Sequence, residues 1–121
     1  MSGMSLEVLW AEILGVISRI GEKIQGVKAH LSDRLDDRFR KLDSEFSAVN
    51  LTLAGSIGIR GRRTFMLTVL EEAAWLLAQL RSFGDGFAAR ADKVLVGRVF
   101  QIGLNRIEGS LDRLRVLVTV G

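Results

Sequence analysis

The chain has 121 residues, of which 48% are hydrophobic and 26% charged, a length and composition typical of one folded domain. It contains no cysteine and a single histidine, His30, which excludes disulfide frameworks, thiolate catalysis and cysteine zinc sites and argues strongly against a histidine-based triad or metal site. The net charge of +3 equals the contribution of one cluster, Arg60, Arg62 and Arg63, so the field of a generally basic nucleic-acid binder is absent.

A heptad pattern of apolar residues occupies the first part of the chain. We call it the N-terminal seam, and its steps of three and four connect Leu6, Trp10, Ile13, Ile17, Ile20, Ile24, Val27 and Leu31. Two steps of four, to Leu35 and Phe39, then insert an extra turn before the rhythm resumes at Leu42 and continues to Leu53. The pattern predicts one continuous helix over about residues 5–53.

The length of that helix determines the architecture that we expect. About 48 residues at 1.5 Å each extend roughly 70 Å, whereas a compact chain of this size has a radius of gyration of about 14 Å. The helix must therefore lie along other helices, from its own chain or from other copies. Since isoleucine fills both core positions of the N-terminal seam, which favours three or more strands in parallel coiled coils, we predict a homo-oligomer of three or more copies.

In that interpretation the N-terminal seam is the interface between copies. We would expect Ile20→Asp to dissociate the oligomer, because every copy would then place a carboxylate in the same core layer. The charges that flank the seam are sparse, so the sequence leaves parallel and antiparallel pairing equally open.

Residues 54–63 are predicted to form a loop, because they contain three glycines beside the arginine cluster. Apolar residues that alternate from Leu51 to Ile59 leave a short hairpin across Gly55-Ser56 as an alternative. Arg60, Arg62 and Arg63 admit three interpretations: a solvated loop, contact with the phosphates of nucleic acid or anionic lipid, and pairing with acids of a neighbouring subunit.

Two further helices are predicted to return along the first. One covers about residues 64–83 and ends at Gly84, and the other covers about residues 86–117 and is capped by Asp85. The expected fold is mainly α, an elongated helical hairpin or coiled coil that forms a single domain over residues 1–121, with the return over 64–118. The β-branched residues of the last segment leave an α+β fold, with strands near 93–103 and 115–120, as the alternative.

No combination of residues predicts catalysis or metal binding. His30 has no neighbouring carboxylate or nucleophile in the pattern, and Glu71 and Glu72 point about 100° apart on a helix, so they cannot face one another. The three aspartates between residues 33 and 37 lack the glycine turn and spacing of a calcium loop. We therefore expect no enzyme activity, no metal, no cofactor and no small-molecule substrate.

The longest uncharged run, residues 46–59, has 14 residues, too few to span a bilayer. The N-terminus shows no signal or transit peptide, so we expect an intracellular, cytoplasmic chain. The leading functional interpretation is a non-enzymatic, homo-oligomeric helical scaffold or adaptor that acts through protein–protein contacts. The alternatives are a nucleic-acid-binding accessory protein that uses Arg60, Arg62 and Arg63, and a peripheral membrane protein that uses the apolar face of residues 6–17 or the segment 46–59.

Overall fold

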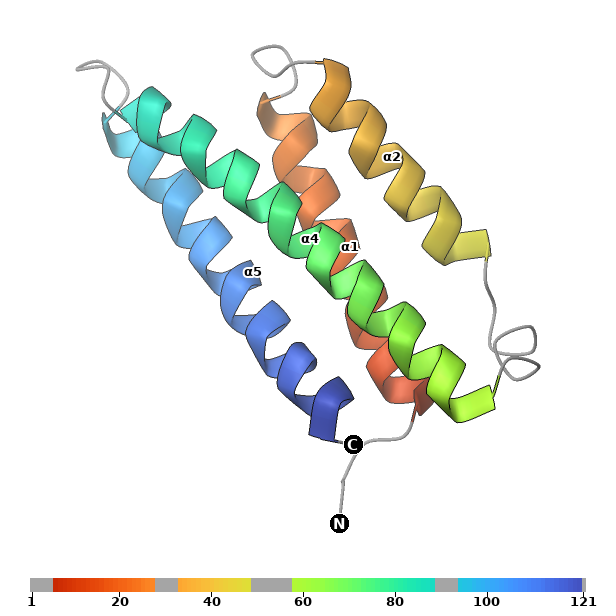
Figure 1. The fold of residues 1–121 in the computed structure, drawn as a ribbon. Coiled ribbons are helices and arrows are strands. Elements are labelled where there is room, and N and C mark those ends of the chain that lie inside the picture. Colours follow the sequence, from red (N-terminus) through yellow and green to blue (C-terminus); the bar gives the residue numbers. More distant parts are fainter. Residues whose placement is uncertain (1–5, 28–32, 49–57, 89–93, 121) are drawn as a thin grey trace.

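A computed structural model describes residues 6–27, 33–48, 58–88 and 94–120, and each segment is one α-helix. The helices are α1 (Leu6–Val27), α2 (Asp33–Ala48), α4 (Gly58–Ala88) and α5 (Val94–Val120). Successive helices run antiparallel; α1, α4 and α5 pack on one another, and α2 lies against α1 and α4 on the side away from α5 (Figure 1). The predicted mainly α fold is confirmed, and the α+β alternative is wrong, since residues 94–103 and 115–120 lie in α5.

The prediction of one continuous helix over residues 5–53 is wrong, because α2 folds back along α1. The ring of Phe39 lies against Gly21, where an added Cβ would come within 2.6 Å of its Cζ atom. On one straight helix these residues, 18 positions apart, would be separated by about 27 Å. The helices α1 and α2 have the same apolar period because each buries one stripe of residues in a shared core. The period of a helix does not depend on its direction, so it does not show that the chain reverses between them.

The boundaries predicted around α4 are also wrong. The helix α4 begins at Gly58, so residues 58–63, the last six residues of the predicted loop over 54–63, are helical. The predicted helix stop, Gly84, and the predicted cap, Asp85, lie inside α4, where this helix meets α5. A Cβ on Gly84 would come within 2.6 Å of Nε2 of Gln101. The same Nε2 donates a hydrogen bond to Asp85 Oδ1 at 2.9 Å. Gly84 thus leaves room for the Gln101 side chain of α5 and does not end α4.

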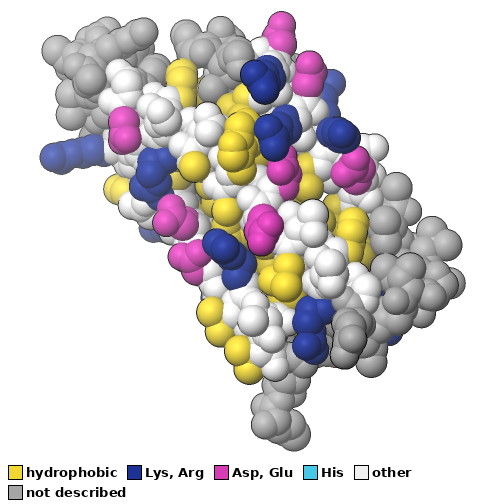
Figure 2. Space-filling view, in the orientation of Figure 1, with side chains coloured by type: hydrophobic (Ala, Val, Ile, Leu, Met, Phe, Trp, Pro, Cys, Tyr) yellow, Lys and Arg dark blue, Asp and Glu magenta, His cyan; other side chains and the backbone are white. Residues whose placement is uncertain are grey.

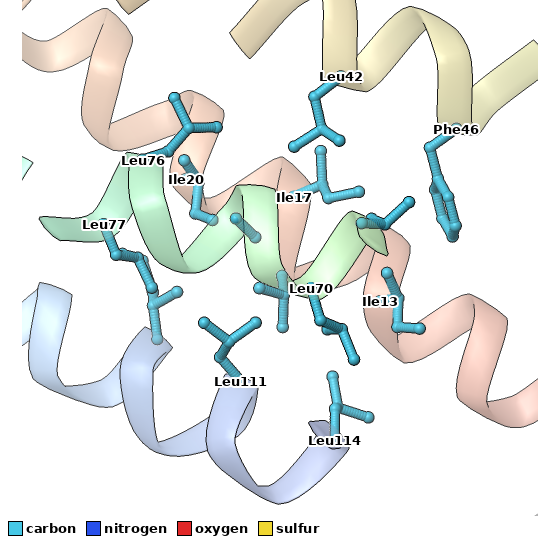
Figure 3. Close-up of a cluster of buried hydrophobic side chains, with 14 of the residues drawn as sticks. Ile13, Ile17, Ile20, Leu42, Phe46, Leu70, Leu76, Leu77, Leu111 and Leu114 are labelled. Carbon is cyan, nitrogen blue, oxygen red and sulfur yellow. The ribbon is translucent and has the colours of Figure 1, made fainter. Parts of the chain in front are cut away.

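All four helices contribute to one hydrophobic core. Figure 3 shows its side chains converging from different helices: Ile13, Ile17 and Ile20 from α1, Leu42 and Phe46 from α2, Leu70, Leu76 and Leu77 from α4, and Leu111 and Leu114 from α5. Full burial of each such side chain contributes about 1.5–3 kcal/mol. The bundle therefore depends on this shared core far more than on the ion pairs at its surface.

Candidate interaction surfaces

The described part of the N-terminal seam lies in the core of a single chain. Ile13, Ile17, Ile20 and Ile24 are at most 1% exposed, and Trp10 is 5% exposed. Val27 is partly buried against the same core, whereas the side chain of Leu6 and all of Leu31 lie outside the described residues. The chain's own helices therefore cover the seam where we expected a second copy, and the number of copies stays a prediction.

Three stacked aromatic rings join three helices near one end of the bundle. The ring centroids of Trp10 and Phe46 are 4.6 Å apart, those of Phe46 and Phe65 are 5.7 Å apart, and those of Trp10 and Phe65 are 5.8 Å apart. Such pairs contribute about 0.5–1.5 kcal/mol each beyond the burial of their area. Phe46 is completely buried, so the cluster anchors α2 to α1 and α4 and its central ring offers no free face for a nucleic-acid base to stack on.

The arginine cluster lies in the first two turns of α4 instead of in a loop. Arg62 and Arg63 are half-buried, and the side chain of Arg60 lies outside the described residues. Arg62 has an interaction partner of its own. Positive charge at this end of a helix opposes the helix dipole, so the cluster does not stabilise α4. Contact of these arginines with phosphate stays a prediction.

Arg38 connects α2 to α4. Its Nε donates a hydrogen bond to Glu72 Oε1 at 2.5 Å and its Nη2 donates one to Oε2 at 3.3 Å, while the guanidinium carbon lies 3.9 Å from the centroid of the Trp75 ring. The hydrogen bond to Glu72 raises the pKa of Arg38 above its ordinary value, against the opposing effect of desolvation. A raised pKa on a cation contributes stability that is lost only as the pH rises through that value, so Arg38 does not act as a switch near neutral pH.

Two grooves border α4, and both have mixed charge. A groove of about 430 Å³ between α2 and α4 is lined by Arg38, Lys41, Glu45 and Phe65, among others. A second groove, of about 410 Å³, lies between α4 and α5. Its rim carries an ion pair between Arg81 Nη2 and Glu108 Oε2. Figure 2 shows acidic and basic side chains interspersed on the visible face, so neither groove presents the one-signed field that would attract a polyanion.

The described residues contain no group of three histidine, aspartate or glutamate side chains placed to hold a metal ion. Asp36 forms a salt bridge with Arg40 at 2.9 Å, and Glu72 is engaged by Arg38. His30 lies outside the described residues. In the same described segments, none of the helices combines the length and the apolar character needed to cross a bilayer.

Large exposed hydrophobic side chains gather on the outer face of α5. Val99 is 61% exposed, Ile102 53%, Val116 61% and Val120 80%. They belong to a second series with steps of three and four, which we call the α5 outer face: Val99, Ile102, Arg106, Gly109, Arg113, Val116 and Val120. Each of the last five members of the series lies two positions after a buried residue. Two residues turn a helix by about 200°, so the α5 outer face points away from the core. The buried residues are Leu104, Ile107, Leu111, Leu114 and Val118.

The sequence interpretation missed this face because it assigned one apolar stripe to each helix. The signal was present in the alternation of Val116, Val118 and Val120, which supports only the alternative of a strand near residues 115–120. On a helix that alternation places Val118 in the core and the other two residues on the opposite side.

Comparisons with known protein families, curated proteins and solved structures found no match to this chain. The fold and its surfaces define a class of protein, an antiparallel helical bundle whose grooves carry mixed charge and whose exposed large hydrophobic residues lie mostly on one helix.

Proposed function

We propose that this chain is a non-enzymatic helical scaffold or adaptor that assembles with copies of itself and acts through protein–protein contacts. The observation that carries the proposal is the α5 outer face. Single hydrophobic residues on a protein surface are ordinary, whereas exposed apolar residues aligned along one element mark a surface that another macromolecule covers.

The α5 outer face is held on a rigid support, which favours binding. The opposite side of α5 is buried in the core. Arg113 Nη2 donates a hydrogen bond to Glu12 Oε2 of α1 at 2.9 Å, and Arg81 of α4 pairs with Glu108 of α5. A surface that is already ordered loses little conformational entropy on binding, so more of the contact energy appears as affinity.

Nucleic-acid binding has less support from the described side chains. It would depend on three arginines of which two are half-buried, and Arg62 already has a partner. A polyanion is usually bound by a patch or stripe of exposed cations, and this arrangement differs from that. The salt dependence of any assembly will separate the two functions, because phosphate contacts weaken strongly as salt is added.

The double variant Ile102→Asp/Val116→Asp tests the proposal. Each substitution places a carboxylate at an exposed position, so the variant should stay folded by circular dichroism while its self-association weakens by about a hundredfold, since charges buried at an interface are costly. The measurement is the absolute mass by light scattering on a sizing column over a range of protein concentrations.

The matched control is Leu14→Asp, the same change at an exposed apolar residue on α1. It should assemble as the unmodified chain does. An unmodified chain that is monomeric at every concentration, or a double variant that assembles normally, would contradict the proposal.

A further inference from the structure

The α5 outer face has the same order of side-chain types in both directions along the helix. From either end it presents two apolar residues, an arginine and a glycine, then an arginine and two apolar residues, with Gly109 at the centre. A two-fold interface uses the same patch on both partners, so each patch must complement itself. Resting on the proposed function, we infer that a second copy of this chain binds antiparallel along the α5 outer face, with the two-fold axis close to Gly109.

The apolar ends of the face match in this arrangement. From Val99 to Val120 the face is about 32 Å long. Reversal about Gly109 brings Val99 and Ile102 of each copy alongside Val116 and Val120 of the other. All four side chains are more than half exposed in the single chain, so their burial against one another gives the pairing its driving force.

Gly109 is suited to the centre of such an interface. A Cβ added to Gly109 would meet nothing within 4 Å in its own chain, so no contact inside the bundle requires a glycine there. Glycine is nevertheless unfavourable in the interior of a helix. A missing side chain at the point where two helices cross allows their backbones to approach closely, and this property suits Gly109 to the position of the axis.

The charges of the face favour the antiparallel direction. Arg113 pairs with Glu12 of its own chain, and the Glu12 side chain remains 33% exposed. Arg106 forms no salt bridge with the residues that the structure describes. The antiparallel arrangement places Arg106 of one copy beside Glu12 and Arg113 of the other, where the carboxylate accepts from both guanidinium groups. A parallel arrangement would instead set the two Arg106 side chains against each other.

Disulfide cross-linking tests the direction, because the unmodified chain contains no cysteine. The single variants Val99→Cys and Val120→Cys are prepared in the full chain, one of them with a tag that separates it by size. They are oxidised with glutathione disulfide, alone and as an equimolar mixture. A disulfide requires Cα atoms within about 7 Å, and the two Val99 positions would lie about 30 Å apart in the antiparallel pair.

The inference predicts that the mixed disulfide forms about tenfold faster than either homodimeric disulfide, because the pairing raises the effective concentration of the two thiols. Ile102→Cys with Val116→Cys is a second pair that reports the same register. Val99→Cys with Val116→Cys, and Ile102→Cys with Val120→Cys, answer the same question if the register is shifted by about one turn. Faster cross-linking of Val99→Cys or Ile102→Cys to itself would show parallel pairing and overturn the inference while the proposed function stands. Equal rates in all combinations would show random collision and would also overturn it.

Gly109→Lys tests the position of the axis. It should weaken self-association at least about tenfold, because each added ammonium group would face the arginines and the ammonium group of the other copy. Gly15→Lys is the control, since Gly15 of α1 also has open space around a built Cβ, and it should leave self-association unchanged. Unchanged association of Gly109→Lys would place the axis elsewhere and overturn the inference. A monomeric unmodified chain would overturn the inference together with the proposed function.

Discussion

Two glycines of α1 show how much the surroundings of a single residue decide. Gly15 has nothing within 4 Å of a built Cβ, whereas a Cβ on Gly21 would meet the Phe39 ring at 2.6 Å. Both residues lie in the interior of the same helix, so their intrinsic helix propensity is the same. The contact with α2 is what distinguishes them.

Alanine substitutions at these glycines should therefore have effects of opposite sign. Gly15→Ala should raise the free energy of unfolding by about 0.5–1 kcal/mol, because alanine is the better helix former. Gly21→Ala should lower it by about 1–3 kcal/mol, because the methyl group overpacks the contact with Phe39. Urea denaturation followed by circular dichroism measures both. Equal stabilisation by the two substitutions would mean that α2 does not rest on α1 at this point.

At the scale of the element, α2 has the most polar sequence among the helices that the structure describes. Its buried apolar side chains are Leu35, Leu42 and Phe46. The ion pair of Arg38 with Glu72 connects α2 to α4. Exposed ion pairs contribute little to stability. The position of α2 is therefore maintained chiefly by its short apolar stripe, with the stack of Phe46 on Trp10 at one end.

Phe46→Ala should destabilise the bundle by about 3–5 kcal/mol, since it leaves a cavity where three helices meet. Asp43→Ala, on the exposed side of the same helix, is the control and should change stability by less than about 0.5 kcal/mol. Thermal and urea unfolding would both report the difference. A small effect of Phe46→Ala would show that the aromatic stack does not anchor α2.

For the whole molecule, the principal change from the sequence-based expectation concerns what covers the N-terminal seam. An extended helix needs other copies to bury its apolar stripe, whereas an antiparallel bundle buries the stripe with its own helices. Ile20 has no exposed area within the single chain. The seam is therefore required for folding of the chain itself, and the proposed assembly is assigned to the α5 outer face.

Ile20→Asp should accordingly unfold the chain instead of dissociating an oligomer. An unpaired carboxylate in the core costs several kcal/mol, which is comparable with the total stability of about 5–15 kcal/mol expected for a domain. Helical circular dichroism and the unfolding midpoint are the measurements. A folded, monomeric Ile20→Asp variant would return the seam to the role of an interface between copies.

The sequence by itself determined that the chain is helical and which side of α1 faces a core. Ile13, Ile17, Ile20 and Ile24 could be predicted as buried because a helix repeats its faces every 3.6 residues, and that repeat is a local property of the chain. The same reasoning predicted a helix over about residues 86–117, and residues 94–117 of that range lie in α5, although Val116, Val118 and Val120 also alternate as they would in a strand.

The tertiary structure decided how the described residues divide into helices, the direction of those helices and the candidate site. The packing of Phe39 on Gly21 reverses the chain between α1 and α2, and such a contact between distant residues leaves no mark on the period of either segment. The helical period distinguishes Val118 from Val116, but only the placement of α5 against α1 and α4 decides that the stripe containing Val118 is covered within the chain while Val116 remains at the surface.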